Sequence, residues 1–204
     1  MRQEVDRCAK AVELAQEGKK VAVICSGDPG IYAMAGLVFE VVHGQHKVVG
    51  ARRAVPLSSI DIEIIPGIPA LSSCAARLGA PLMHDFASVS LSDLLTPWEL
   101  IEKRLEAAAS ADFVIVIYNP KSKGRQEHIA KARDIILKHR GPDTPVGIVK
   151  AATRENETVA ITDLKNMLDS EIDMQSTVII GNSRTFTWAD WMITPRGYSN
   201  KYKV

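Results

Sequence analysis

The chain has 204 residues, with 25 basic and 24 acidic side chains and a formal net charge of +1. A charge this small creates no overall electric field that would draw the protein to nucleic acid or to an anionic membrane. Its 46% apolar and 24% charged residues are an ordinary globular balance, and no stretch is apolar enough for a membrane span or a signal peptide. The three cysteines, Cys8, Cys25 and Cys74, are too widely spaced for a disulfide framework or a structural zinc motif. We therefore expect a cytoplasmic protein without a metal site, with Cys25 buried in the core.

The first part of the chain alternates between helical and strand-like patterns. An amphipathic helix is predicted over residues 5–17, and the apolar run at 20–25 is typical of a strand covered on both faces of a parallel sheet. The next predicted elements are a helix at 31–42, an irregular loop at 43–59, a strand at 60–65 and a helix at 70–78. Two strands make a poor sheet, so we expect either that another chain completes this part or that the sequence begins late.

The second part of the chain repeats the alternation with more strands. Strands are predicted at 88–91, 113–118, 145–149, 158–161 and 177–181, and helices at 96–110, 126–139 and 164–168. This pattern indicates an α/β fold with two α/β domains, residues 1–86 and 87–204, and a ligand cleft between them.

Several predicted strands end in turns rich in glycine, proline and asparagine. The turns are Ser26-Gly27-Asp28-Pro29-Gly30, Pro66-Gly67-Ile68-Pro69, Tyr118-Asn119-Pro120 and Gly181-Asn182-Ser183. Ligands of parallel α/β sheets bind beyond the carboxyl ends of strands, where glycine permits a close backbone approach. Any one of these segments alone is better explained as a good turn former, but their recurrence at comparable strand ends indicates a small-molecule site. Dinucleotide, P-loop, metalloprotease and serine-hydrolase motifs are all lacking.

The turns also carry a resemblance to a known family. The run from Ser26 to Ala35 resembles the Gly-Asp-Pro loop of the tetrapyrrole (corrin and porphyrin) methyltransferases, and Pro66 to Ala70 with Leu78 to Leu82 resembles their second segment. One branch, the precorrin-3B C17-methyltransferases with their cobalt-factor III relatives, is similar in the segments Ser90 to Trp98, Tyr118 to Pro120, Gly181 to Ser183 and Thr194 to Tyr198. Members of this family begin earlier, with a strand and a Gly-x-Gly-Pro-Gly loop, so we expect the N-terminal domain here to be incomplete.

The resemblance implies transfer of a methyl group from S-adenosylmethionine (SAM) to C17 of a precorrin, coupled to ring contraction, by a homodimer. Matching the motifs residue by residue assigns SAM binding to Ser26, Gly27, Asp28, Tyr32, Met34, Pro69, Ala70, Asn119, Ala151, Ala152, Gly181 and Pro195. The carboxylates of a tetrapyrrole need cationic partners, for which the candidates are Lys121, Lys123, Arg125, Lys150 and Arg154. These five side chains are equally well explained as a solvated basic rim. His84 and Asp85 are the candidates for acid–base chemistry, with a structural role as the alternative.

Two alternatives to this function remain open. One is a member of the same family with another substrate (a different precorrin, a diphthamide precursor or ribosomal RNA), and the other is a non-catalytic, truncated SAM-binding domain. The net charge of +1 argues against RNA. The sequence leaves open whether the tetrapyrrole carries cobalt.

Overall fold

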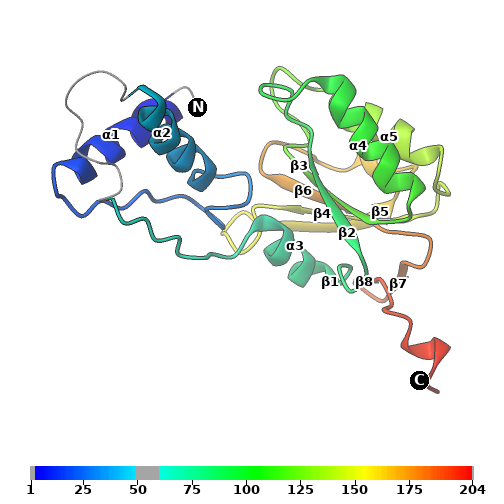
Figure 1. Cartoon of the computed structure of the whole chain (residues 1–204). Coiled ribbons are helices and arrows are strands. Elements are labelled where there is room, and N and C mark those ends of the chain that lie inside the picture. Colours follow the sequence, from blue (N-terminus) through cyan, green and yellow to red (C-terminus); the bar gives the residue numbers. More distant parts are fainter. Residues whose placement is uncertain (1–2, 49–59, 204) are drawn as a thin grey trace. The chain divides into compact units, whose positions relative to one another are not determined.

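The chain divides into two compact units, Met1–Pro69 and Ala70–Val204, in a computed structural model that describes residues 3–48 and 60–203 (Figure 1). Helix α3 (Ala70–Leu78) belongs to the second unit, because it packs on the strands there. The domain boundary after residue 86 stays a prediction, whereas compactness alone divides the chain before α3.

The described part of the first unit consists of two helices and two extended segments. Helices α1 (Glu4–Gln16) and α2 (Ala35–Val48) pack against each other. The predicted strands at 20–25 and 60–65 are wrong, because neither segment belongs to a sheet of the described residues. A strand needs a hydrogen-bonded neighbour, and these segments have none among residues 3–48 and 60–203. Ile24 is 90% and Ile65 is 73% exposed. Cys25, expected in the core, is exposed for the same reason.

The structure also differs from the prediction in the first part of the loop expected at residues 43–59. Residues 43–48 continue helix α2, which therefore extends beyond the predicted end at residue 42. The rest of that prediction, residues 49–59, lies outside the described residues.

The second unit is built on a five-stranded sheet. Its order is β2-β3-β6-β4-β5, formed by β2 (Phe86–Ser90), β3 (Val114–Tyr118), β6 (Ser176–Ile180), β4 (Pro145–Lys150) and β5 (Thr158–Asp163). Only β2 and β3 pair in parallel, and the other three pairs are antiparallel. The carboxyl ends of β2, β3 and β4 therefore lie at one edge of the sheet, and the carboxyl end of β6 lies at the opposite edge.

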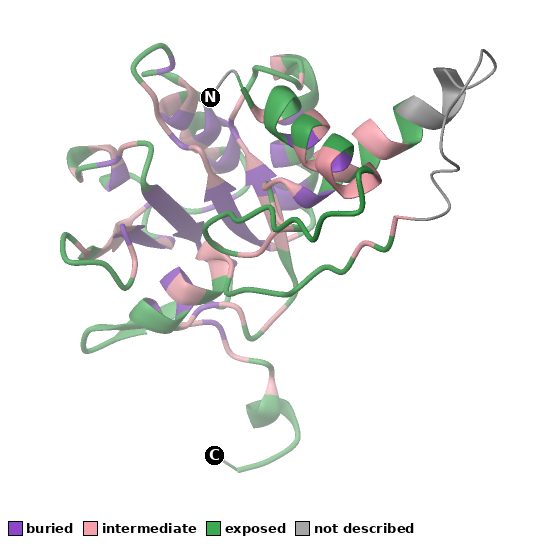
Figure 2. Cartoon of the chain, turned by 90° about the vertical axis from the view of Figure 1, so that its left-hand side faces the viewer, coloured by how far each residue is buried: buried purple, intermediate pink, exposed green. Residues whose placement is uncertain are grey.

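Both faces of this sheet are covered by helices, which explains the uninterrupted apolar character of β3. Successive side chains of a strand point to opposite faces, so Ile115 and Ile117 pack under α4 (Trp98–Ser110) and α5 (His128–Leu137), while Val114 and Val116 pack under α3. Figure 2 shows the sheet as the buried layer of this unit. The predicted helices and strands of this unit are confirmed, except that the helix at 164–168 is the short 3-10 turn η2 (Met167–Asp169).

A second, smaller sheet in the same unit escaped prediction. Its order is β1-β8-β7, formed by β1 (Gly79–Ala80), β8 (Trp191–Ile193) and β7 (Phe186–Trp188), and the 3-10 turn η3 (Tyr198–Asn200) follows it. These strands are two or three residues long, which is too short for an alternating pattern to be recognised. No helix in the described part of the chain is long and apolar enough to cross a membrane.

Candidate functional site

The edge of the large sheet where β2, β3 and β4 end carries an unusual backbone. Asn119 follows β3 with φ 51° and Ala151 follows β4 with φ 49°, both in the left-handed region that favours glycine. Thr153, two residues further on, has φ 64°. A non-glycine residue held in this region costs about 1–3 kcal/mol, and such strain gathers at functional sites. Two predicted SAM residues therefore share this conformation at one edge of the sheet, and Asp112 and Ala189 adopt it elsewhere in the unit.

Neighbouring groups fix the positions of these two residues. The Asn119 side-chain amide donates a hydrogen bond to Ser90 Oγ at the end of β2 (2.9 Å), and the Ala151 amide donates to the Gln175 carbonyl (3.2 Å). At the start of α3, the Leu71 amide donates to Tyr118 Oη (2.8 Å). The apolar cluster under α3 also includes Ala70 and Ala152. The structure therefore brings Ala70, Asn119, Ala151 and Ala152 together at the end of the sheet that α3 begins from.

In the first unit, Asp28 joins the two predicted SAM loops. Its Oδ1 accepts a hydrogen bond from the Gly30 amide (2.8 Å), and its Oδ2 accepts one from the Gly67 amide (3.1 Å). The backbones touch there, because a Cβ placed on Gly67 would lie 2.1 Å from the Gly27 carbonyl oxygen. Ser26, Gly27 and Asp28 are thereby held against the segment that ends in Pro69. The carboxylate acts as a bridge between loops, which sequence reasoning did not foresee.

Two further predicted SAM residues follow on the same loop. Tyr32 has φ 52° and is 54% exposed, and Met34 is half-buried just before α2. Tyr32 is thus a third predicted SAM residue in the left-handed region, after Asn119 and Ala151.

A buried arginine holds the turn that carries Asn119. Arg125 is 9% exposed, and its Nη1 donates to the carbonyls of Leu91 (2.8 Å) and Asn119 (3.4 Å). Its Nε lies 3.5 Å from Asp93 Oδ1, and the other carboxylate oxygen of Asp93 lies 3.4 Å from His128 Nε2. Arg125 was predicted to meet a substrate carboxylate, but its contacts are internal and position the backbone. The Ser90 and Asp93 roles were missed, although both lie in the segment that carries the family resemblance.

Lys150 is likewise engaged within the protein. Its ammonium lies 2.5 Å from Glu171 and 2.9 Å from Asp173, and hydrogen bonds to these carboxylates raise the pKa of Lys150. Burial alone would raise the pKa of Asp173, but the hydrogen bond from Lys150 and other donors outweigh it, so the pKa is lowered. The other predicted cations are Lys121, which is half-buried, and Lys123 and Arg154, which are exposed. These three side chains follow β3 and β4 at the Asn119 edge. They are better candidates for binding a polyanionic substrate than Arg125 and Lys150, which are engaged within the protein.

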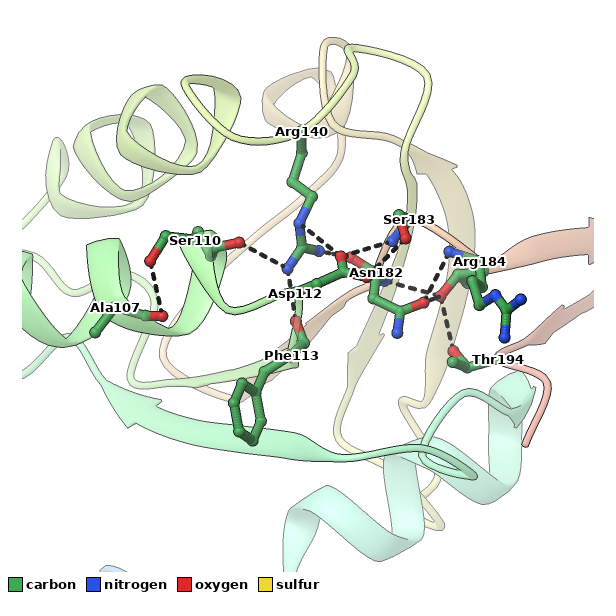
Figure 3. A network of polar contacts seen from close by, with 12 residues as sticks. Ala107, Ser110, Asp112, Phe113, Arg140, Asn182, Ser183, Arg184 and Thr194 are labelled. Carbon is green, nitrogen blue, oxygen red and sulfur yellow. Dashed lines mark hydrogen bonds and ion pairs between the residues drawn. The ribbon is translucent and has the colours of Figure 1, made fainter. Parts of the chain in front are cut away.

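Gly181 follows β6 at the opposite edge, and its carbonyl accepts a hydrogen bond from Arg140, a residue of the polar network in Figure 3. The buried Arg140 donates to the carbonyls of Gly181 and Phe113 and forms an ion pair with Asp112. Asp112 in turn accepts hydrogen bonds from the amide and hydroxyl of Ser183 (2.9 and 2.6 Å). Burial lowers the pKa of Arg140, while the Asp112 carboxylate opposes this shift. The polar groups of the turn after β6 are therefore used in contacts within the protein.

Pro195 belongs to the same side of the unit as Gly181. Thr185 and Thr194 share a hydrogen bond (2.8 Å), which links the turn after β6 to the residue just before Pro195. The structure does not bring Gly181 or Pro195 to Asn119, because β6 runs antiparallel to β3 and β4. Sequence reasoning took all strand ends as equivalent and had no signal for this reversal.

The predicted acid–base pair also lies away from Asn119. His84 and Asp85 precede β2, and the Asp85 carbonyl accepts a hydrogen bond from the amide of Val114 at the start of β3 (3.1 Å). The Asp85 amide donates to His84 Nδ1 (2.9 Å), and Arg196 lies 4.0 Å from the Asp85 carboxylate. The pair is thus at the amino-end edge of the sheet.

Comparison with known proteins relates this geometry to a family. Residues 2–168 match the family described as Tetrapyrrole (Corrin/Porphyrin) Methylases. A cobalt-factor III methyltransferase from Priestia megaterium is 56% identical over 206 residues, which make up 100% of this chain and 36% of that protein. A probable cobalt-factor III C(17)-methyltransferase from Salmonella typhimurium is 49% identical over 98% of this chain and 78% of that protein.

The solved structures give the same relationship. The crystal structure of the methyltransferase CobJ matches with a TM-score of 0.83 and 36% identity, covering 95% of this chain and 77% of that chain. The present chain thus spans about a third of the length of the Priestia relative and under four fifths of the other two. The matches in sequence and in fold show that the chain belongs to the tetrapyrrole (corrin/porphyrin) methylase family.

Proposed function

We propose that the chain is a SAM-dependent C-methyltransferase of cobalamin biosynthesis that methylates C17 of precorrin-3B or cobalt-factor III, with ring contraction. The observation that carries the proposal is the left-handed backbone of Tyr32, Asn119 and Ala151, three residues that motif matching had assigned to SAM. The names of the relatives from Priestia megaterium and Salmonella typhimurium support the choice of substrate.

Bound SAM would supply an activated methyl group, because its sulfonium leaves as a neutral thioether when the carbon–sulfur bond breaks and the new carbon–carbon bond forms. The protein's task is to hold the carbon nucleophile and the methyl donor in line. This task needs no protein nucleophile, and the residues at the Asn119 edge are of a kind that positions a ligand through small side chains and backbone groups.

Two sets of residues are the candidates for SAM binding, one in each unit. In the first unit they are Ser26, Gly27, Asp28, Tyr32, Met34 and Pro69, and in the second unit they are Ala70, Asn119, Ala151 and Ala152. Turns with backbone groups near small residues suit the polar and charged ends of SAM, and the small side chains of Ala151 and Ala152 suit contact with a flat ring. We keep Gly181 and Pro195 outside the proposed site.

The tetrapyrrole would be held through its carboxylates. Lys121, Lys123 and Arg154 are the proposed partners, because Arg125 and Lys150 are engaged by carboxylates and carbonyls of the protein. We further propose that the enzyme acts in the cytoplasm and as a homodimer.

Titration calorimetry with SAM, followed by turnover on cobalt-factor III and on precorrin-3B, tests the proposal. We expect SAM to bind at one site per chain and one of the two substrates to be methylated. Binding without turnover on either substrate would support the non-catalytic alternative, and the absence of SAM binding would contradict both readings.

The contact between the two loops of the first unit gives a sharper prediction. In Gly67→Ala, the new methyl group would meet the Gly27 carbonyl at 2.1 Å, so the loops must separate and the Asp28 bridge must weaken. We expect the dissociation constant for SAM to rise roughly tenfold, a change of about 1.4 kcal/mol. Gly36→Ala is the matched control, because no atom lies within 4 Å of a Cβ at Gly36. Equal affinities of the two variants in the same calorimetric titration would remove the first-unit loops from the SAM site.

A further inference from the structure

The loop between β4 and β5 holds two strained residues at the Asn119 edge. It spans residues 151–157 and includes the proposed SAM contacts Ala151 and Ala152 and the proposed substrate contact Arg154. Ala151 and Thr153 both have a positive φ, of 49° and 64°. Such a backbone persists only where the surrounding structure holds it. The loop therefore needs a contact that fixes its shape.

The Glu157 carboxylate supplies such a contact with both of its oxygens. Its Oε2 accepts a hydrogen bond from the Thr153 amide (2.5 Å), and its Oε1 accepts one from Arg77 Nε (2.8 Å) and lies 2.6 Å from Arg77 Nη2. Arg77 lies in the last turn of α3, and helical side chains lean toward the N-terminus of their helix, which here is the end at the Asn119 edge. One carboxylate thus ties the strained loop to α3.

The Glu157 side chain is mostly buried and carries its charge. Only 15% of it is exposed, although the residues on either side, Asn156 and Thr158, are exposed. The amide of Thr153 and the guanidinium of Arg77 hold the pKa of Glu157 below its ordinary value of 4.5, against the effect of burial. The carboxylate is therefore ionised at neutral pH, and its charge strengthens both hydrogen bonds.

Two turns connect Glu157 to the start of the loop. The Arg154 amide donates a hydrogen bond to the Ala151 carbonyl (3.0 Å), and the Glu157 amide donates one to the Arg154 carbonyl (3.1 Å). Arg154 therefore belongs to both turns. A change in the position of Glu157 would shift Arg154 and Ala151 together.

We propose that Glu157, held by Arg77, is a positioning residue that keeps the 151–157 loop in the shape that binds SAM and sets the position of Arg154 for a carboxylate of the tetrapyrrole. The inference rests on the proposed function, because it concerns residues that were assigned there to SAM and substrate. Glu157 would contact neither ligand and would act through the loop alone. A loop that is ordered before the ligand arrives loses less conformational entropy when the ligand binds.

Glu157→Gln tests the inference, because a glutamine has one acceptor oxygen where the carboxylate has two. Its NH2 group would face either the Thr153 amide or the Arg77 guanidinium, so one of the two contacts must break. We expect hydrogen–deuterium exchange of the full chain to become roughly tenfold faster at residues 151–157, with strand β3 unchanged. The dissociation constant for SAM, measured by calorimetry, should rise by roughly the same factor.

Glu106→Gln is the matched control. Glu106 is also a partly exposed carboxylate in an ion pair, with His139 Nε2 at 2.7 Å, but this pair links α4 to the segment after α5. The variant should keep the SAM affinity of the parent chain and the parent exchange at residues 151–157.

The Arg154→Ala background separates positioning from a general loss of stability. With SAM saturating, we expect Glu157→Gln to raise the KM for the tetrapyrrole roughly tenfold in the parent chain and about twofold or less in Arg154→Ala, where no arginine is left to position. An equal rise in both backgrounds, or an unchanged SAM affinity in Glu157→Gln, would each overturn the inference and leave the proposed function standing. A parent chain that bound no SAM would refute the proposed function and the inference with it.

Discussion

At the scale of single residues, Arg125 connects the core of the second unit to the turn that carries Asn119. We expect Arg125→Lys to lower the free energy of unfolding by about 1–3 kcal/mol, because a lysine cannot serve the Leu91 and Asn119 carbonyls and the Asp93 carboxylate together. The SAM affinity should fall as well. Denaturant titration and calorimetry measure the two effects.

The exposed Lys123 is the matched control for Arg125. Lys123→Ala should leave both the stability and the SAM affinity unchanged and should raise the KM for the tetrapyrrole. If Arg125→Lys instead raised only the KM and left stability as it was, Arg125 would be a substrate residue after all.

His128 gives this part of the molecule a pH dependence. Its ring packs on Trp98 with centroids 4.4 Å apart, and its Nδ1 is buried without a hydrogen-bond partner in the described part of the chain. Burial lowers the pKa of His128 below its ordinary value of 6.5, since the attraction of Asp93 is smaller and Arg125 and Lys131 repel the proton. The folded state therefore binds this proton more weakly than the unfolded chain does.

It follows that the contribution of His128 to stability is complete above pH 6.5 and is lost as the pH falls below that value. We expect the free energy of unfolding of His128→Gln to depend less on pH between 5 and 7 than that of the parent chain. Urea titrations at several pH values measure the slope. An unchanged slope in His128→Gln would refute the argument.

At the scale of elements, close packing between α3 and β4 fixes the sheet beneath the Asn119 edge. A Cβ on Gly147 of β4 would lie 2.3 Å from Leu78 Cδ1, and Leu78 is fully buried. We expect Gly147→Ala to destabilise the chain by about 1–3 kcal/mol, because overpacking forces α3 away from the strand. The control is Gly124→Ala, where no atom lies within 4 Å of a Cβ. Equal midpoints of thermal unfolding for the two variants would contradict this packing.

The longer elements of the second unit were predictable because each carries its own pattern. Strand β3 is aliphatic from Val114 to Ile117, and α4 repeats buried residues at Ile101, Leu105 and Ala108. The segments 20–25 and 60–65 carry an equally clear strand pattern and yet form no ladder. Local composition can indicate that a segment suits a sheet, but it cannot supply the neighbour with which the strand must pair.

The candidate site was predictable only in part, because some of its features depend on the assembled sheet. The resemblance pointed to Asn119 and Ala151, and the structure places both at one edge of the sheet because β3 and β4 run in the same direction. The turn after β6 looked equivalent in sequence, but strand direction is a property of the assembled sheet. The roles of Arg125 and Asp93 depend on contacts across the fold, which no spacing in the sequence reveals.

At the scale of the whole molecule, the two units contribute different parts of the proposed enzyme. The second unit has a sheet covered on both faces and a strained edge with Asn119 and Ala151. The first unit has the Asp28 bridge and an open pair of segments.

The account rests on methyl transfer to a tetrapyrrole, and isotope transfer measures it most directly. The full chain is incubated with trideuteromethyl SAM and cobalt-factor III, and the tetrapyrrole is analysed by mass spectrometry. We predict a product that carries one trideuteromethyl group. A tetrapyrrole that acquires no deuterium, in parallel with an active relative that labels it, would contradict the account.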